Sequence, residues 1–143
     1  MRTAAALVIL LVLATGLVAQ QDETRSVWDG VFNAEQAKRG EAPYRKECGT
    51  CHGDMMTGGE MAPPLAGGAF LANWNGLTLG DLLERIRKTM PSQAPGKLSR
   101  QMYTDILAHI LNVNEFPAGE KELPTGTEFL RRIRIESTKP EKK

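Results

Sequence analysis

The chain has 143 residues, and its 18 basic and 17 acidic side chains leave a formal net charge of +1. Charges this close to balance predict neither nucleic-acid binding nor a partner attracted strongly from a distance. The apolar fraction of 41% is ordinary for a globular protein, and the length suits one small domain rather than two.

The first twenty residues have the features of a secretory signal peptide. Arg2 supplies a positive charge, an apolar stretch runs from Ala4 to Val18, and small residues precede a polar run that begins at Gln20. The stretch is shorter than the roughly 20 residues of a typical membrane-spanning helix. We therefore predict a signal peptide over residues 1–20 that is cleaved, followed by an N-terminal extension over residues 21–33. The alternative is an uncleaved signal that anchors the chain in a membrane.

The first helix of the mature chain is predicted to begin after Asn33, a favourable N-cap residue. Gln36, three residues later, is the expected reciprocal capping partner. The helix should run into Cys48. Gly40 lies inside it, where glycine costs about 1 kcal/mol relative to alanine, so we expect another helix to approach closely at that point. Tyr44 lies one turn further along the same face.

Residues 48–52 read Cys-Gly-Thr-Cys-His, which is the attachment motif of a covalently bound c-type haem. Two thiols three positions apart can each bond to one vinyl group of the same porphyrin, and His52 can then reach the iron. The alternatives are a zinc site, a thioredoxin-like redox pair and a structural disulfide. Zinc would need two more ligands, but the chain has no other cysteine and only one other histidine, His109. The sequence therefore predicts one covalent haem c at Cys48, Cys51 and His52.

A helix after the motif is predicted from Thr78, with Asp81 as its capping partner. The stretch from Gly53 to Gly68 should be loop, because glycines interrupt it repeatedly. Apolar residues on one face of the helix are spaced as a buried stripe. They are Leu79, Leu82, Leu83 and Ile86. The helix must end before Pro91.

Met90 precedes that proline, so it should be in an extended or turn conformation just after the helix. Two prolines and a glycine in residues 91–96 make a stiff loop, which can hold a weak sulfur ligand in place. Other methionines follow His52 too closely or begin the last helix. They are Met55, Met56, Met61 and Met102. We predict His52 and Met90 as the two ligands of the haem iron; the alternatives are His109 and an open sixth position.

The clearest helix runs from Ser99, its N-cap, to about Asn112. Its apolar stripe is predicted to pack in the core. The stripe comprises Tyr103, Ile106, Leu107, Ile110 and Leu111. His109 falls between these positions and is expected to face solvent.

The last part of the chain, residues 117–143, has the pattern of an appended C-terminal extension that is partly disordered. The alternation of basic and apolar residues from Arg131 to Ile135 could add a short strand. We favour a loosely packed segment that frays at its end.

These motifs together resemble the class I, mono-haem cytochromes c. The order is a helix leading into Cys-x-x-Cys-His, a Pro-x-Leu-x-Gly stretch that begins at Pro63, then Met-Pro and a closing amphipathic helix. The resemblance implies an all-α fold with three main helices around one covalent haem, over residues 34–116. It also implies that the carbonyl of Pro63 accepts a hydrogen bond from the ring of His52. Gly40 and Tyr44 match the positions where the first and last helices of the family cross.

A narrower resemblance is to small bacterial cytochromes that accompany pyrroloquinoline-quinone dehydrogenases. It depends on four runs, at residues 27–32, 71–76, 89–91 and 116–119. It implies a quinoprotein as electron donor, with a terminal oxidase or another cytochrome as acceptor. The signal peptide predicts a periplasmic location. Trp74 lies in the loop between the haem contacts, where its indole N–H can donate to a haem propionate, as it does in several class I members; the alternative is packing on the haem edge alone.

The sequence thus predicts an electron carrier and no enzyme, because it contains no nucleophile with a base and no paired acid and base. Three alternatives stay open. A haem protein with a labile sixth ligand could be a gas sensor or a peroxidase-like enzyme, and a fixed cytochrome subunit could belong to a larger oxidoreductase.

Overall fold

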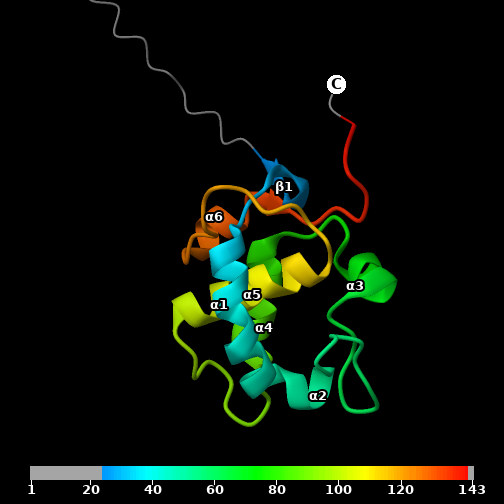
Figure 1. The fold of residues 1–143 in the computed structure, drawn as a ribbon, viewed down its shortest axis with the longest axis vertical. Helices are drawn as coiled ribbons and strands as arrows, with labels where there is room; N and C mark the ends of the chain where they lie inside the picture. Colours follow the sequence, from blue (N-terminus) through cyan, green and yellow to red (C-terminus); the bar gives the residue numbers. More distant parts are fainter. Residues whose placement is uncertain (1–23, 142–143) are drawn as a thin grey trace, which may run out of the picture.

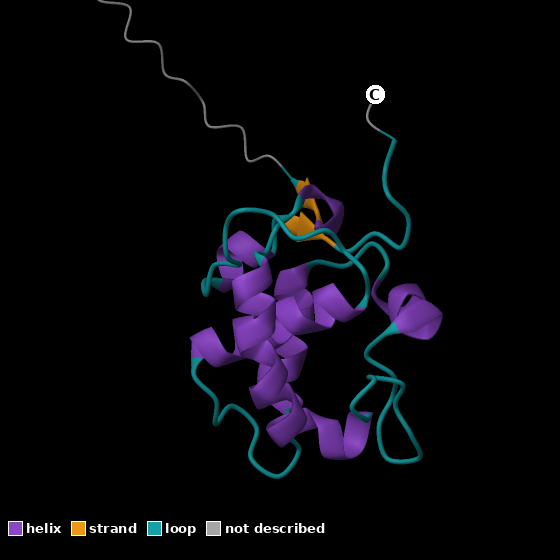
Figure 2. Cartoon of the chain, viewed as in Figure 1, coloured by secondary structure: helices purple, strands orange, loops and turns teal. Residues whose placement is uncertain are grey.

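A computed structural model describes residues 24–141, which form helices in contact around a central crossing and two very short strands (Figures 1 and 2). In chain order the elements are β1 (Arg25–Ser26), η1 (Val27–Asp29), α1 (Ala34–Tyr44), η2 (Arg45–Gly49), α2 (Thr50–His52), α3 (Gly67–Trp74), α4 (Leu79–Thr89), α5 (Arg100–Val113), α6 (Thr127–Leu130) and β2 (Ile133–Arg134). The predicted mostly helical fold is confirmed. The predicted signal peptide lies outside the described residues.

The crossing of α1 and α5 is the centre of the structure (Figure 1). A methyl group built on Gly40 of α1 would overlap the main-chain carbonyl of Asp105 in α5. Glycine is therefore required there because the two backbones touch, as the sequence predicted. The apolar stripe of α5 is buried, and Ser99 caps this helix by accepting a hydrogen bond from the Met102 N–H at 3.1 Å.

The fourth helix, α4, is bounded as its sequence predicted. The Thr78 hydroxyl accepts the Asp81 N–H at 3.1 Å, and the Asp81 carboxylate accepts the Thr78 N–H at 3.0 Å. This reciprocal pair satisfies main-chain donors at the start of the helix. At the other end Met90 is extended, with φ −128° and ψ 151°. The helix therefore stops just before Pro91 and leaves Met90 at the beginning of a loop.

The predicted capping role of the Gln36 side chain was wrong. Asn33 does cap α1 by accepting the Gln36 N–H at 2.8 Å. However, the buried Gln36 amide pairs with the main chain of Leu123: its oxygen accepts the Leu123 N–H at 2.7 Å, and its nitrogen donates to the Leu123 carbonyl at 3.2 Å. Buried main-chain groups need such partners. Gln36 therefore fastens the C-terminal segment to the start of α1.

Gln36→Leu is expected to destabilise the holoprotein by about 2–4 kcal/mol, because it leaves a buried N–H and a buried carbonyl of Leu123 without partners. Urea unfolding followed by far-UV circular dichroism measures this change. The control is Glu35→Ala on the adjacent exposed position, which should stay within about 0.5 kcal/mol of wild type. Equal unfolding midpoints for Gln36→Leu and wild type would contradict the assignment.

The C-terminal segment packs more tightly than predicted. Leu130 and Ile135 have no exposed surface, and Ile133 is 4% exposed. The predicted alternation does form a strand: β2 pairs in parallel with β1, with Ile133 opposite Arg25. Trp28 adds a hydrogen bond from its indole N–H to the Glu136 carbonyl at 2.9 Å. The expectation of loose packing was therefore wrong for these residues, because alternate apolar side chains reach the core.

The helix α3 was not predicted. It has no side-chain N-cap of its own. Instead, the Asn114 side chain, just after α5, accepts the Gly67 N–H at 3.0 Å and donates to the Leu65 carbonyl at 2.9 Å. The start of α3 is thus fixed by a residue distant in sequence. This helix carries Trp74 at its C-terminal end, where the sequence predicted a loop.

Candidate functional site

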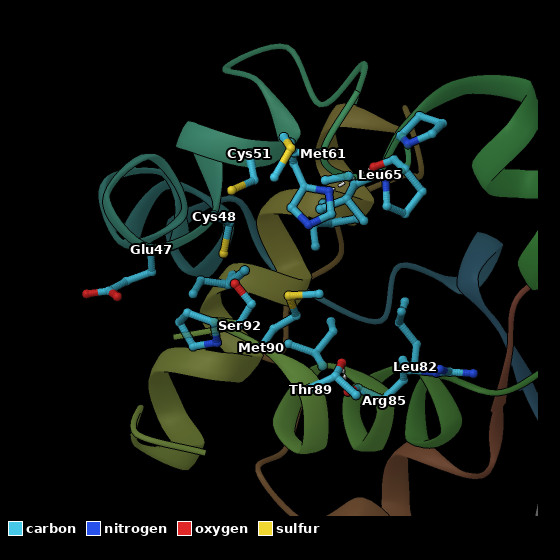
Figure 3. A pocket seen from close by; sticks show the side chains of 18 of the residues that line it. Glu47, Cys48, Cys51, Met61, Leu65, Leu82, Arg85, Thr89, Met90 and Ser92 are labelled. Carbon is cyan, nitrogen blue, oxygen red and sulfur yellow. Dashed lines mark hydrogen bonds between the residues drawn. The ribbon is translucent and has the colours of Figure 1, made fainter. Parts of the chain in front are cut away.

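A largely apolar cavity of about 560 Å³ opens beside α2 and α4 (Figure 3). This volume lies in the range of sites that bind small molecules and cofactors. Its walls come from η2, α2, the loop that follows α2, the end of α3, α4, the loop after α4, and α5. Its apolar lining includes Leu65, Trp74, Leu82, Ile86, Ile106 and Ile110.

Both cysteines of the Cys-x-x-Cys-His motif line this cavity. The chain reaches them by a change of helix type: Pro43 has no N–H to donate inside α1, and the next turn, η2, is a π-helix that leads into α2. Cys48 is half-buried and Cys51 is exposed. The sulfur atoms of both cysteines and of Met90 face the same space (Figure 3).

The Cys48 thiol has the properties of a buried thiol rather than of a reactive thiolate. Burial, with added repulsion from the Glu47 carboxylate, raises the pKa of Cys48 to about 11. Nucleophilic redox cysteines have the opposite shift, because the thiolate is their reactive form. The environment of Cys48 therefore disfavours a thioredoxin-like pair.

His52 is almost fully buried, with 5% of its surface exposed, and it lines the cavity. Its ring Nδ1 lies 2.8 Å from the main-chain carbonyl oxygen of Pro63. A carbonyl can only accept, so Nδ1 carries the donated proton, and in the neutral ring the lone pair is on Nε2. A neutral imidazole with a free ring nitrogen can act as a metal ligand.

Met90 also lines the cavity, from the loop that follows α4. Its main-chain carbonyl accepts a hydrogen bond from the hydroxyl of Tyr103 in α5 at 2.9 Å. The structure thus places the thioether of Met90 and the imidazole of His52 around one cavity, on two elements far apart in sequence.

His109 and three of the four other methionines considered lie outside the cavity lining. His109 is outside the cavity lining, and its ring is half-buried 5.5 Å from the ring of Tyr44, rather than facing solvent as expected. Burial lowers the pKa of His109. Met56 is fully buried outside the lining, and Met55 is 74% exposed. Met61 does line the cavity, but at its open edge, where it is 86% exposed.

Trp74 lines the cavity at the end of α3, with its ring 6.4 Å from that of Phe70. Asn73 and Arg85 also line it, and the sequence had not singled them out. A signal for Arg85 was present in the spacing: Arg85 lies one turn before Thr89, the last residue of α4, so both share the helix face next to the predicted ligand Met90. Asn73 could not be found without knowing that α3 exists.

The residues around the cavity fit a covalently bound haem. The lining is mainly apolar, two thiols and an imidazole belong to one short segment, and a thioether comes from another. Within residues 24–141 there is no group of three or more His, Cys, Asp or Glu side chains that could hold a separate metal ion.

Comparison with known proteins gives one family. Residues 35–110 match the family described as cytochrome C oxidase, cbb3-type, subunit III. Searches of curated proteins and of solved structures gave no match.

Proposed function

This chain belongs to the cytochrome C oxidase, cbb3-type, subunit III family, and we propose that it is a periplasmic carrier of single electrons in which His52 and Met90 would hold the haem iron. Membership makes it a cytochrome c domain, which binds haem c covalently through Cys48, Cys51 and His52, transfers electrons and lies outside the cytoplasm. Within residues 24–141, every helix is too short or too polar to cross a bilayer. We assign the haem-binding domain to residues 34–116.

The observation that supports this function most is the meeting of His52, Met90 and the two cysteines around one apolar cavity. When bound there, the haem iron supplies one-electron chemistry by alternating between its ferric and ferrous states. The Pro63 carbonyl would hold the His52 ring in one orientation and raise its basicity. Met90 would remain bound in both states, and the apolar walls would favour the less charged ferrous form.

We propose that electrons enter and leave at the cavity edge near Cys51. Cys51 is exposed, and the neighbouring Met61 is 86% exposed. A mostly uncharged rim of this kind suits brief docking with redox partners. The proposed donor is a dehydrogenase, and the narrower sequence resemblance specifies a quinoprotein. The proposed acceptor is a terminal oxidase or another cytochrome. Trp74 is proposed to donate its indole N–H to a haem propionate.

Met90→Ala tests this function. Loss of the sulfur ligand is expected to lower the midpoint potential by about 100 mV or more, because axial ligands control haem potentials over a wide range. It should also let carbon monoxide bind rapidly to the reduced protein. Redox titration and carbon monoxide spectra measure the two effects.

Met55→Ala is the control, because Met55 is exposed and outside the cavity lining. It should keep the wild-type potential. If wild type already bound carbon monoxide as readily as Met90→Ala, the sixth position would be labile, and a gas sensor or peroxidase-like enzyme would replace the carrier.

The family description names an oxidase subunit, which favours a second candidate, a fixed subunit of a larger oxidoreductase. Size-exclusion chromatography of detergent extracts from the native host distinguishes the two. Elution of the haem at the size of a single chain supports the carrier, and elution with a large oxidoreductase complex supports the subunit.

A further inference from the structure

We propose that two side-chain contacts clamp the Met90 segment and keep the sixth position of the iron closed to small ligands: the hydrogen bond from Tyr103 to Met90, and the ion pair between Lys97 and Glu47. This inference rests on the proposed function, because it assumes that Met90 is the ligand. It makes Tyr103, Lys97 and Glu47 positioning residues, which act through Met90 and do not touch the iron.

The first contact fixes the main chain of Met90 itself. Tyr103 is 1% exposed and belongs to α5, the central helix. Its hydroxyl donates to the Met90 carbonyl at 2.9 Å, and the Gly96 N–H approaches the same oxygen at 3.5 Å. The carbonyl of Met90 is therefore held both by α5 and by the far side of its own loop.

The second contact fixes the end of that loop. Lys97 Nζ lies 2.5 Å from Glu47 Oε2, and Glu47 immediately precedes Cys48. The carboxylate of Glu47 points away from the space that the cysteine sulfurs face (Figure 3). Its side chain is only 11% exposed, so this pair is better shielded from water than an ordinary surface pair. The ion pair thus joins η2, the helical turn that contains Cys48, to residues 90–97, which we call the methionine loop.

The loop between these two points is internally bonded. The Ala94 N–H donates to the Pro91 carbonyl at 2.9 Å, and the Lys97 N–H donates to the Ala94 carbonyl at 3.3 Å. Residues 90–97 can therefore shift as one unit that is fixed at both ends. A small ligand that takes the place of the Met90 sulfur needs the space of that side chain. Displacing the unit to provide that space breaks both contacts, so each contact opposes ligand entry.

Imidazole titration of the ferric holoprotein tests the clamp. Tyr103→Phe removes only the hydroxyl and is expected to raise imidazole affinity about fivefold, as the loss of one hydrogen bond predicts. Lys97→Gln should raise it about threefold, and Lys97→Arg should restore the wild-type value. In the double variant Tyr103→Phe/Lys97→Gln, the fold increase in imidazole affinity should be at least the product of the two single increases.

The matched control is Arg45→Gln. It breaks the Arg45–Glu41 ion pair at 2.8 Å, which lies within one helical segment and does not touch the methionine loop. Imidazole affinity should not change in this variant. Unfolding by urea is measured on the same samples, so that a general loss of stability is separated from opening of the sixth position.

Failure of the proposed ligation and failure of the clamp give different results. If wild type lacks the far-red charge-transfer band of iron-bound methionine, the proposed ligation fails. If wild type has the band but both Tyr103→Phe and Lys97→Gln bind imidazole as wild type does, the clamp is overturned while the function stands. Should Tyr103→Phe fold poorly, the Lys97→Gln and Lys97→Arg pair alone decides, because Lys97 is a loop residue with a half-exposed side chain.

Discussion

Exchanging Cys48 and Cys51 together for alanine is expected to yield a chain that keeps no haem under denaturing conditions and does not reach the native fold. The cofactor would be the largest apolar element of the core. An empty cavity of about 560 Å³ would cost at most about 13 kcal/mol at about 24 cal/mol per Å³. Water entry through the open side reduces this cost. Even a third of this cost would remove much of the free energy of unfolding, which is about 5–15 kcal/mol for a typical domain.

Haem staining of denatured gels and near-UV circular dichroism measure the two losses. Thr50→Ala is the control, because Thr50 is exposed between the cysteines and should leave both properties unchanged. Cys51→Ala alone should retain haem through the single bond at Cys48. A double variant with native near-UV dichroism and no haem would show that the fold does not depend on the cofactor.

The second large effect is expected from Gly40→Ala at the crossing of α1 and α5. The added methyl group would overlap the Asp105 carbonyl, which is main chain and cannot turn aside. Separating the helices disrupts the central contact of the fold, so we expect a loss of about 2–3 kcal/mol, despite the gain of about 1 kcal/mol in helix propensity. Thermal or urea unfolding of the holoprotein measures the difference.

Gly68→Ala is the matched control. Gly68 also lies in a helix, α3, but a methyl group built on it meets nothing within 4 Å. This variant should be neutral or slightly stabilised, within about 1 kcal/mol. If Gly40→Ala were as stable as Gly68→Ala, the close approach of the two backbones would be refuted.

The elements that the sequence predicted well are those determined by neighbours three or four residues apart. The Thr78–Asp81 cap and the Ser99 cap each join groups within one turn of helix, and both are present. The stop of α4 at Met90 follows from the steric effect of the next proline. In the same way, the thiols and imidazole of the haem motif lie within five residues.

What the sequence missed depends on contacts across long separations. The Gln36 amide looked like a local cap, but its partner, Leu123, lies 87 residues away. Similarly, α3 is started by Asn114, 47 residues from Gly67. A local pattern cannot show which distant main-chain group will lack a partner once the chain folds.

The C-terminal segment illustrates the same limit. The alternation from Arg131 to Ile135 indicated a strand, yet a strand of two residues is not stable by itself. It forms because β1, at the other end of the described chain, supplies the pairing partner. The clamp proposed for Met90 is also non-local, since Lys97 and Glu47 are fifty residues apart in sequence.

The central claim is that Met90 is the sixth ligand of the iron, and the far-red absorption spectrum of the purified ferric protein tests it most directly. Sulfur bound to ferric haem iron gives a weak charge-transfer band in that region. The account predicts that wild type has the band and that Met90→Ala loses it. A wild-type spectrum without the band, or a band that persists in Met90→Ala, would contradict the coordination by His52 and Met90.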